Sequence, residues 1–148
     1  MEKTSHISNQ FDHDLESIRS NVLLMGGLVE VNVKNAIKSL LERDQALAEE
    51  VSTADFQVNK MEIEIDEECT QIIARRQPAA GDLRLVLTVV KVITDLERIG
   101  DEAEKIGRYA QTLASKKAKT GMHLELDTLA QKVTSMLNKT LDAFARMD

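Results

Sequence analysis

The chain has 148 residues and a mass of 16.5 kDa, which suits one domain with a genuine hydrophobic core. Nineteen Lys and Arg residues against 25 Asp and Glu residues give a net charge of −6, the opposite of the balance expected in a nucleic-acid-binding protein. One Cys excludes an intrachain disulfide and a multi-cysteine metal site, while 3% aromatic residues, one Pro and six Gly favour long helices around an aliphatic core.

The sequence carries no signal for membrane insertion or secretion. No run of 18 apolar residues is present, and the first residues lack the apolar stretch of a signal peptide. We therefore expect a soluble, reduced, cytoplasmic protein that reaches a membrane only through its partners.

Residues 8–43 are predicted to form the first helix. Apolar residues recur there every three or four positions: Phe11, Leu15, Ile18, Val22, Met25, Val29, Val33, Ile37 and Leu40. Gly26 and Gly27 interrupt this stripe at a cost of about 1 kcal/mol each relative to Ala, which indicates close packing or a bend. Asp44 follows at the position where a helix N-cap is expected.

Three further helices are predicted at residues 45–76, 79–115 and 123–147. The second should end before Pro78, because a proline disfavours helical geometry in the residue before it. The third is apolar almost all round between Leu83 and Ile93, so we expect its neighbours to enclose it.

The fourth predicted helix repeats the apolar pattern of the first after a shift of 104 residues. Val29 corresponds to Val133, for example, and Leu40 to Phe144. Any two amphipathic helices can be slid into phase, but a tandem three-helix repeat explains the match better. We therefore predict an all-α protein, with a complete three-helix bundle over 1–115 and the loop and first helix of an incomplete second bundle over 116–148.

The chain looks truncated on this interpretation. The apolar face between Val133 and Phe144 would then need a second chain, which predicts a homodimer.

Two pairs of acids stand four residues apart on neighbouring predicted helices. Glu62 and Asp66 lie on the second helix, and Glu97 and Asp101 on the third. This spacing places both carboxylates of a pair on one helical face, where they repel each other unless a cation lies between them. Hard cations prefer oxygen ligands of this kind, so Glu62, Asp66, Glu97 and Asp101 form a candidate metal site.

The position of Glu97 strengthens this hypothesis. Leu83, Val86, Val90 and Ile93 step by three and four residues, and Glu97 is the next position on the same buried stripe. Acids at this spacing also occur by chance, however, and Asp101 could instead pair with Lys105, and Glu97 with Arg98 or with a neighbouring helix. No His stands beside these acids, which makes a zinc hydrolase site improbable.

Other candidate sites are weak. The sequence contains neither GxxxxGK[ST] nor GxGxxG, so no phosphate-binding loop is visible. We expect His13 to be exposed and without function, and Cys69 to be a buried thiol.

Five segments together resemble the PhoU family of bacterial phosphate-signalling regulators. These are residues 95–101 (DLERIGD), 61–69 (MEIEIDEEC), 76–84 (RQPAAGDLR), 11–27 and 141–148. The resemblance covers the whole chain. It implies two tandem three-helix bundles, with Glu62, Asp66, Glu97 and Asp101 as the metal ligands of the first. The metal would be a divalent or trivalent ion such as Mg, Mn, Fe or Zn.

The resemblance also implies a function. Members of this family are non-enzymatic adaptors between the ATPase subunit (PstB) of the phosphate ABC transporter and the sensor histidine kinase PhoR. They repress the Pho regulon when phosphate is plentiful. Two alternatives stay open: a carboxylate-bridged metalloprotein with its own enzymatic activity, and a purely structural dimerisation module. The first class typically carries Glu-x-x-His motifs, and none occurs here.

Overall fold

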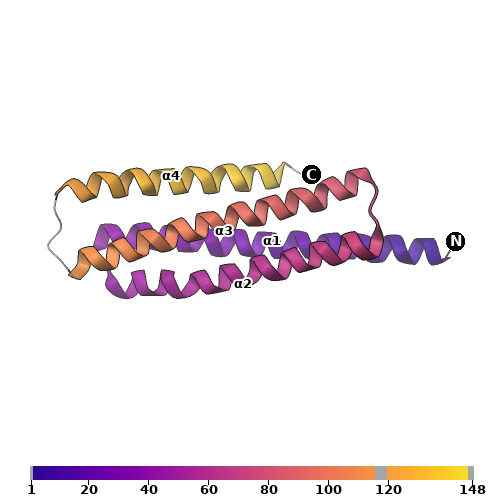
Figure 1. Ribbon diagram of the computed structural model, residues 1–148, viewed down its shortest axis with the longest axis horizontal. Coiled ribbons are helices and arrows are strands. Elements are labelled where there is room, and N and C mark those ends of the chain that lie inside the picture. Colours follow the sequence, from indigo (N-terminus) through magenta and orange to yellow (C-terminus); the bar gives the residue numbers. More distant parts are fainter. Residues whose placement is uncertain (1, 116–119, 147–148) are drawn as a thin grey trace.

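The computed structural model describes residues 2–115 and 120–146, with side chains described for residues 9–113 and 127–146. The described part of the chain forms four helices and contains no strand: α1 (Glu2–Glu42), α2 (Gln45–Arg76), α3 (Ala80–Ser115) and α4 (Thr120–Ala145). Successive helices run in opposite directions, and α1 extends beyond the α2–α3 turn at its N-terminal end (Figure 1). The predicted all-α fold is confirmed. The loop 116–119 lies outside the described residues.

Helix boundaries follow the capping signals in the sequence. The Asp44 carboxylate accepts a hydrogen bond from the backbone N–H of Leu47 at 3.1 Å and caps α2, as predicted. At the other end of α2, Gln77 adopts a left-handed conformation with φ 43°, and Pro78 follows. α3 then begins one residue later than predicted, at Ala80.

The core is aliphatic and is centred on α3, which contacts each of the other three helices. Leu96, Ile99 and Ile106 are fully buried, and they meet Val58 and Ile65 of α2 in one hydrophobic cluster. In the stretch from Leu83 to Ile93, Val86, Val89, Val92 and Ile93 are buried, but Leu87 is 53% exposed, so the prediction that neighbours enclose the third helix holds only in part. Cys69 is also buried, as expected, and burial raises the pKa of its thiol to about 11.

α4 packs against its own chain, lying along α3 and touching α1 (Figure 1). Val133, Leu137 and Phe144 are buried there, so the expectation that this apolar face needs a second chain is wrong. Gly26 contributes to the contact, because a Cβ added to it would lie 3.0 Å from Leu141 Cδ2. The close packing predicted for the glycine pair is thus present at Gly26.

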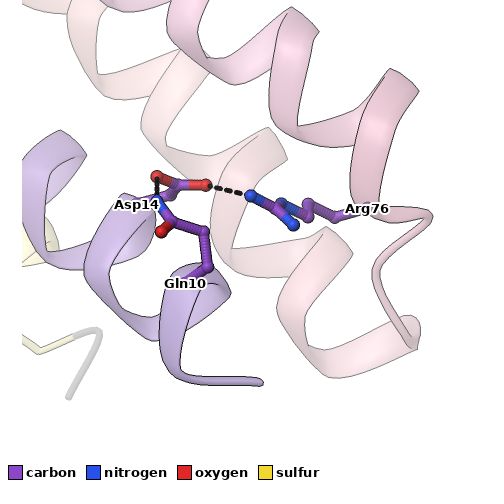
Figure 2. Close-up of polar contacts among 3 residues, drawn as sticks. All are labelled: Gln10, Asp14 and Arg76. Atoms are coloured by element: carbon purple, nitrogen blue, oxygen red, sulfur yellow. Dashed lines mark hydrogen bonds and ion pairs between the residues drawn. The ribbon is translucent and has the colours of Figure 1, made fainter. Parts of the chain in front are cut away.

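Polar contacts fix the alignment of α1 against α2. The Asn21 side-chain amide donates to Glu68 Oε1 at 2.9 Å, and Arg76 lies 3.4 Å from Asp14. Gln10 donates to the other oxygen of Asp14 at 3.1 Å, one turn earlier on α1 (Figure 2). A partly exposed ion pair of this kind contributes about 1 kcal/mol or less, so these contacts set register more than stability.

Two glycines of the bundle should respond to alanine in opposite ways. A Cβ at Gly27 would meet nothing within 4 Å, whereas one at Gly107 would lie 3.3 Å from the Ala48 carbonyl oxygen and 3.4 Å from Val51. We expect Gly27→Ala to raise the free energy of unfolding by up to about 1 kcal/mol through helix propensity. Gly107→Ala should lower it by about 1 kcal/mol, because α2 must move away. Urea denaturation of both variants checks this, and equal effects would contradict the close approach of α2 and α3.

Candidate metal centre

A buried acid, Asp55, lies in the seam between α2 and α3. Asp55 is only 7% exposed, and its Oδ1 atom has no hydrogen-bond partner among the described residues. Burial raises the pKa of Asp55 to about 6, and the negative charges of Asp101 and Glu104 add to the effect. A hydrogen bond with Asn59 opposes it. The surroundings of Asp55 therefore disfavour its charged form.

Gly100 makes room for this acid. A Cβ at Gly100 would lie 3.1 Å from Asp55 Oδ1 and 3.3 Å from Val58 Cγ1. The missing side chain lets α2 approach α3 closely at this level and directs the Asp55 oxygen onto the α3 backbone. Asn59, one turn further along α2, also has a buried side-chain oxygen without a partner in the described region.

The acids of α3 complete the cluster from the other side of the seam. Burial, together with a hydrogen bond to Asp101, raises the pKa of Glu97 to about 7, and the charges of Asp101, Glu62 and Asp55 contribute further. Burial also raises the pKa of Glu62, helped by Asp66 and then Asp101. At neutral pH the cluster can therefore hold a shared proton, which is how adjacent carboxylates relieve repulsion without a cation.

The four predicted acids influence one another to different degrees. The charges of Asp101 and Glu62 raise the pKa of Glu97, whereas Asp66 is exposed and raises the pKa of Glu62 from the next turn of α2. The alternative pairings with Lys105 and with Arg98 do not occur in the described part of the chain. Lys105 pairs with Glu102 at 3.3 Å instead of Asp101, and Arg98 makes no ion pair with Glu97 among the described residues.

Asp55 escaped the sequence analysis, although the pattern contained the signal. The inward stripe of α2 includes Val51, Val58 and Ile65, and Asp55 and Glu62 occupy the intermediate positions at steps of four and three residues. Ala54 and Met61 stand one position before Asp55 and Glu62, and an apolar stripe can be traced through them instead. An acid on a buried stripe is the feature that singled out Glu97, and the same test applied to α2 would have identified Asp55.

These side chains suit a hard cation chemically. The donor set of Asp55, Asn59, Glu62, Glu97 and Asp101 consists only of oxygen atoms, and two of them, Asp55 Oδ1 and Asn59 Oδ1, are buried without a partner. Within residues 9–113 and 127–146, however, no three His, Cys, Asp or Glu side chains are gathered tightly enough to hold a metal ion as they stand. Metal binding therefore requires side-chain rotation within the seam.

The raised pKa of Glu97 gives the metal-free protein a characteristic pH dependence. The folded protein keeps this proton up to about pH 7, while the unfolded chain releases it near 4.5. Because the folded state then binds more protons, stability falls as the pH rises through this window. We expect thermal unfolding in EDTA to show this decline between pH 5 and pH 7.5. Glu97→Gln should make the decline shallower near pH 7. A stability that rises with pH in both the wild type and this variant would contradict the clustering of these acids.

No helix in the described part of the chain is long and apolar enough to cross a lipid bilayer. This agrees with the absence of a hydrophobic run in the sequence.

The chain matches known proteins over nearly all of its length. Residues 22–110 match the family model described as the PhoU domain. The chain is 50% identical over 145 residues to a phosphate-specific transport system accessory protein PhoU homolog of Pseudomonas putida, covering 98% of this chain and 57% of the relative. It is 48% identical over 143 residues to the accessory protein PhoU of Escherichia coli K12, covering 97% of this chain and 59% of the relative. The chain thus spans a little under three fifths of the length of these two curated relatives.

A solved structure gives the same result. The crystal structure of PhoU from Pseudomonas aeruginosa matches with a TM-score of 0.84 and 47% identity, covering 93% of this chain and 66% of that one. The sequence match, the family model and the helical arrangement thus agree, and the chain belongs to the PhoU family.

Proposed function

We propose that this chain belongs to a cytoplasmic, non-enzymatic regulator of phosphate uptake. It would act as an adaptor between the ATPase subunit PstB of the phosphate transporter and the sensor kinase PhoR, and it would repress the Pho regulon when phosphate is plentiful. Such an adaptor needs only a difference in affinity between two conformations of each partner.

The similarity to curated relatives is the observation that carries this proposal. Identities of 48–50% extend along 97–98% of the chain to proteins named as accessory proteins of the phosphate-specific transport system. The surface supports docking as the mode of action. Phe56 and Ile63 of α2 are 77% and 67% exposed and stand seven residues apart, which places them on one face.

Co-purification tests the adaptor role directly. The 148-residue chain and a relative of full length should each be captured by immobilised PstB and by the cytoplasmic region of PhoR. The expected result is retention of both proteins by at least one partner. Retention of the longer relative alone would place the docking surface outside this chain, and retention of neither would overturn the adaptor proposal.

Metal binding is a second proposed property of the same chain. Asp55, Asn59, Glu62, Glu97 and Asp101 would hold a hard cation such as Mg²⁺, Mn²⁺ or Fe³⁺, which would neutralise their mutual repulsion and fasten α2 to α3. The orphaned oxygens of Asp55 and Asn59 support this proposal. An enzymatic role for such a metal is less well supported, because the relatives are named as accessory proteins.

A further inference from the structure

A separate cavity of about 240 Å³ lies between α3 and α4. Each helix contributes four side chains at the spacing of one helical face: Arg98, Asp101, Glu102 and Lys105 from α3, and Leu129, Lys132, Val133 and Met136 from α4. The apolar members all come from α4. Water takes up roughly 30 Å³ per molecule in the liquid, so the cavity can hold a small hydrated ion or a small polar molecule.

The charges around this cavity are not balanced locally. Glu102 forms an ion pair with Lys105 at 3.3 Å. The charge of Asp101 raises the pKa of the acids in the α2–α3 seam, Asp55 and Glu97. Arg98 and Lys132 make no ion pair or hydrogen bond in the described part of the chain, although the protein has a net charge of −6. The lining holds three cationic side chains and two carboxylates, a formal excess of one positive charge, and each helix contributes one cation without an ion pair in the described part of the chain.

We propose that this cavity binds a small oxyanion of the phosphate class, either inorganic phosphate or a phosphate monoester, between Arg98 and Lys132. A guanidinium presents paired N–H donors that match two oxygens of such an anion, and an ammonium adds a point charge. The apolar residues of α4 reduce competition from water beside the anion. Because its two cations come from different helices, the bound anion would also link α4 to the three-helix bundle.

Titration of isotopically labelled protein in EDTA with inorganic phosphate tests the proposal. The expected result is saturable changes in backbone amide signals confined to residues 98–105 and 129–136. Sodium acetate at matched ionic strength should produce no saturable change. A parallel titration with glycerol 3-phosphate distinguishes the two sources of the ligand, because a site for free phosphate would bind the monoester at least tenfold more weakly, whereas a site for esters would not.

Charge variants provide the decisive comparison. Arg98→Gln and Lys132→Gln should each raise the Kd for phosphate at least tenfold, and Arg98→Lys should have a smaller effect because it keeps the charge but not the paired donors. Lys60→Gln on the outer face of α2 is the matched control and should change the Kd less than twofold. Arg98 and Lys132 are both exposed, so their replacement should leave the fold intact, and unchanged thermal unfolding without anion verifies this.

Equal Kd values for the wild type and all variants, or linear shifts that never saturate, would overturn the proposal. The site does not rest on the adaptor role. Phosphate binding is measured on the purified chain, and its failure leaves the co-purification result untouched.

Discussion

Asp55→Asn is expected to stabilise the metal-free protein at pH 8 by about 1–3 kcal/mol. The pKa of Asp55 rises from its ordinary value of 3.8 to about 6 in the folded protein, so the folded state binds more protons than the unfolded state between these values. Stability therefore falls as the pH rises through this window, and above pH 6 the full cost of a buried charge is present. Asparagine removes the charge while keeping the size of the side chain.

Urea denaturation in EDTA at pH 8 and pH 4.5 measures this effect. The gain in the free energy of unfolding should be largest at pH 8 and should shrink at pH 4.5, where Asp55 is mostly protonated in the folded protein. Asp66→Asn is the matched control, because Asp66 is exposed on the same helix, and it should change stability by less than about 0.5 kcal/mol. A loss of stability in Asp55→Asn at pH 8 would show that the carboxylate is held by favourable contacts.

Removing the α3 acids should abolish most metal binding. We expect Glu97→Gln combined with Asp101→Asn to weaken the affinity for Mn²⁺ or Fe³⁺ by at least tenfold, because two charged oxygen ligands become neutral amides. Elemental analysis after dialysis against each metal measures the content, and calorimetry measures the affinity. Asp55→Asn should weaken binding in the same direction, so this substitution would stabilise the metal-free protein while impairing the metal-bound one.

The control for this experiment changes the same amount of charge elsewhere. Asp66→Asn with Glu67→Gln removes two exposed carboxylates from α2 and should leave metal content unchanged. Equal metal content in both double variants would show that binding is nonspecific. A loss confined to the control would restore Asp66 as a ligand and exclude the α3 acids.

Local signals in the sequence predict much of this fold. Asp44 caps α2 because a carboxylate before a helix accepts a backbone hydrogen bond whatever the tertiary structure, and the helix boundaries follow from Asp44 and Pro78. Glu97 was also identifiable, because an acid on a buried stripe is anomalous by periodicity alone. Each of these inferences depends only on residues that are close by in the sequence.

Features that depend on packing between helices were not predictable in this way. α4 covers its apolar face on its own chain, which depends on the close approach of Gly26 and on space left beside α3. Asp55 and Asp66 stand eleven residues apart, about three turns of α2, so periodicity places them at nearly the same angle on the helix. The burial of Asp55 accompanies the close approach of the two helices at Gly100, which sequence periodicity does not reveal.

Asp101 belongs to two environments at once, since it lines the cavity beside α4 and acts on the acids facing α2. A cation that neutralised it from the α2 side would make the α4 side more attractive to anions, and an anion there would in turn favour the cation. Thermodynamic reciprocity requires the two effects to be equal in magnitude. With the two proposed sites occupied, the carboxylate at position 101 would couple them, so that each ligand would bind most tightly in the presence of the other.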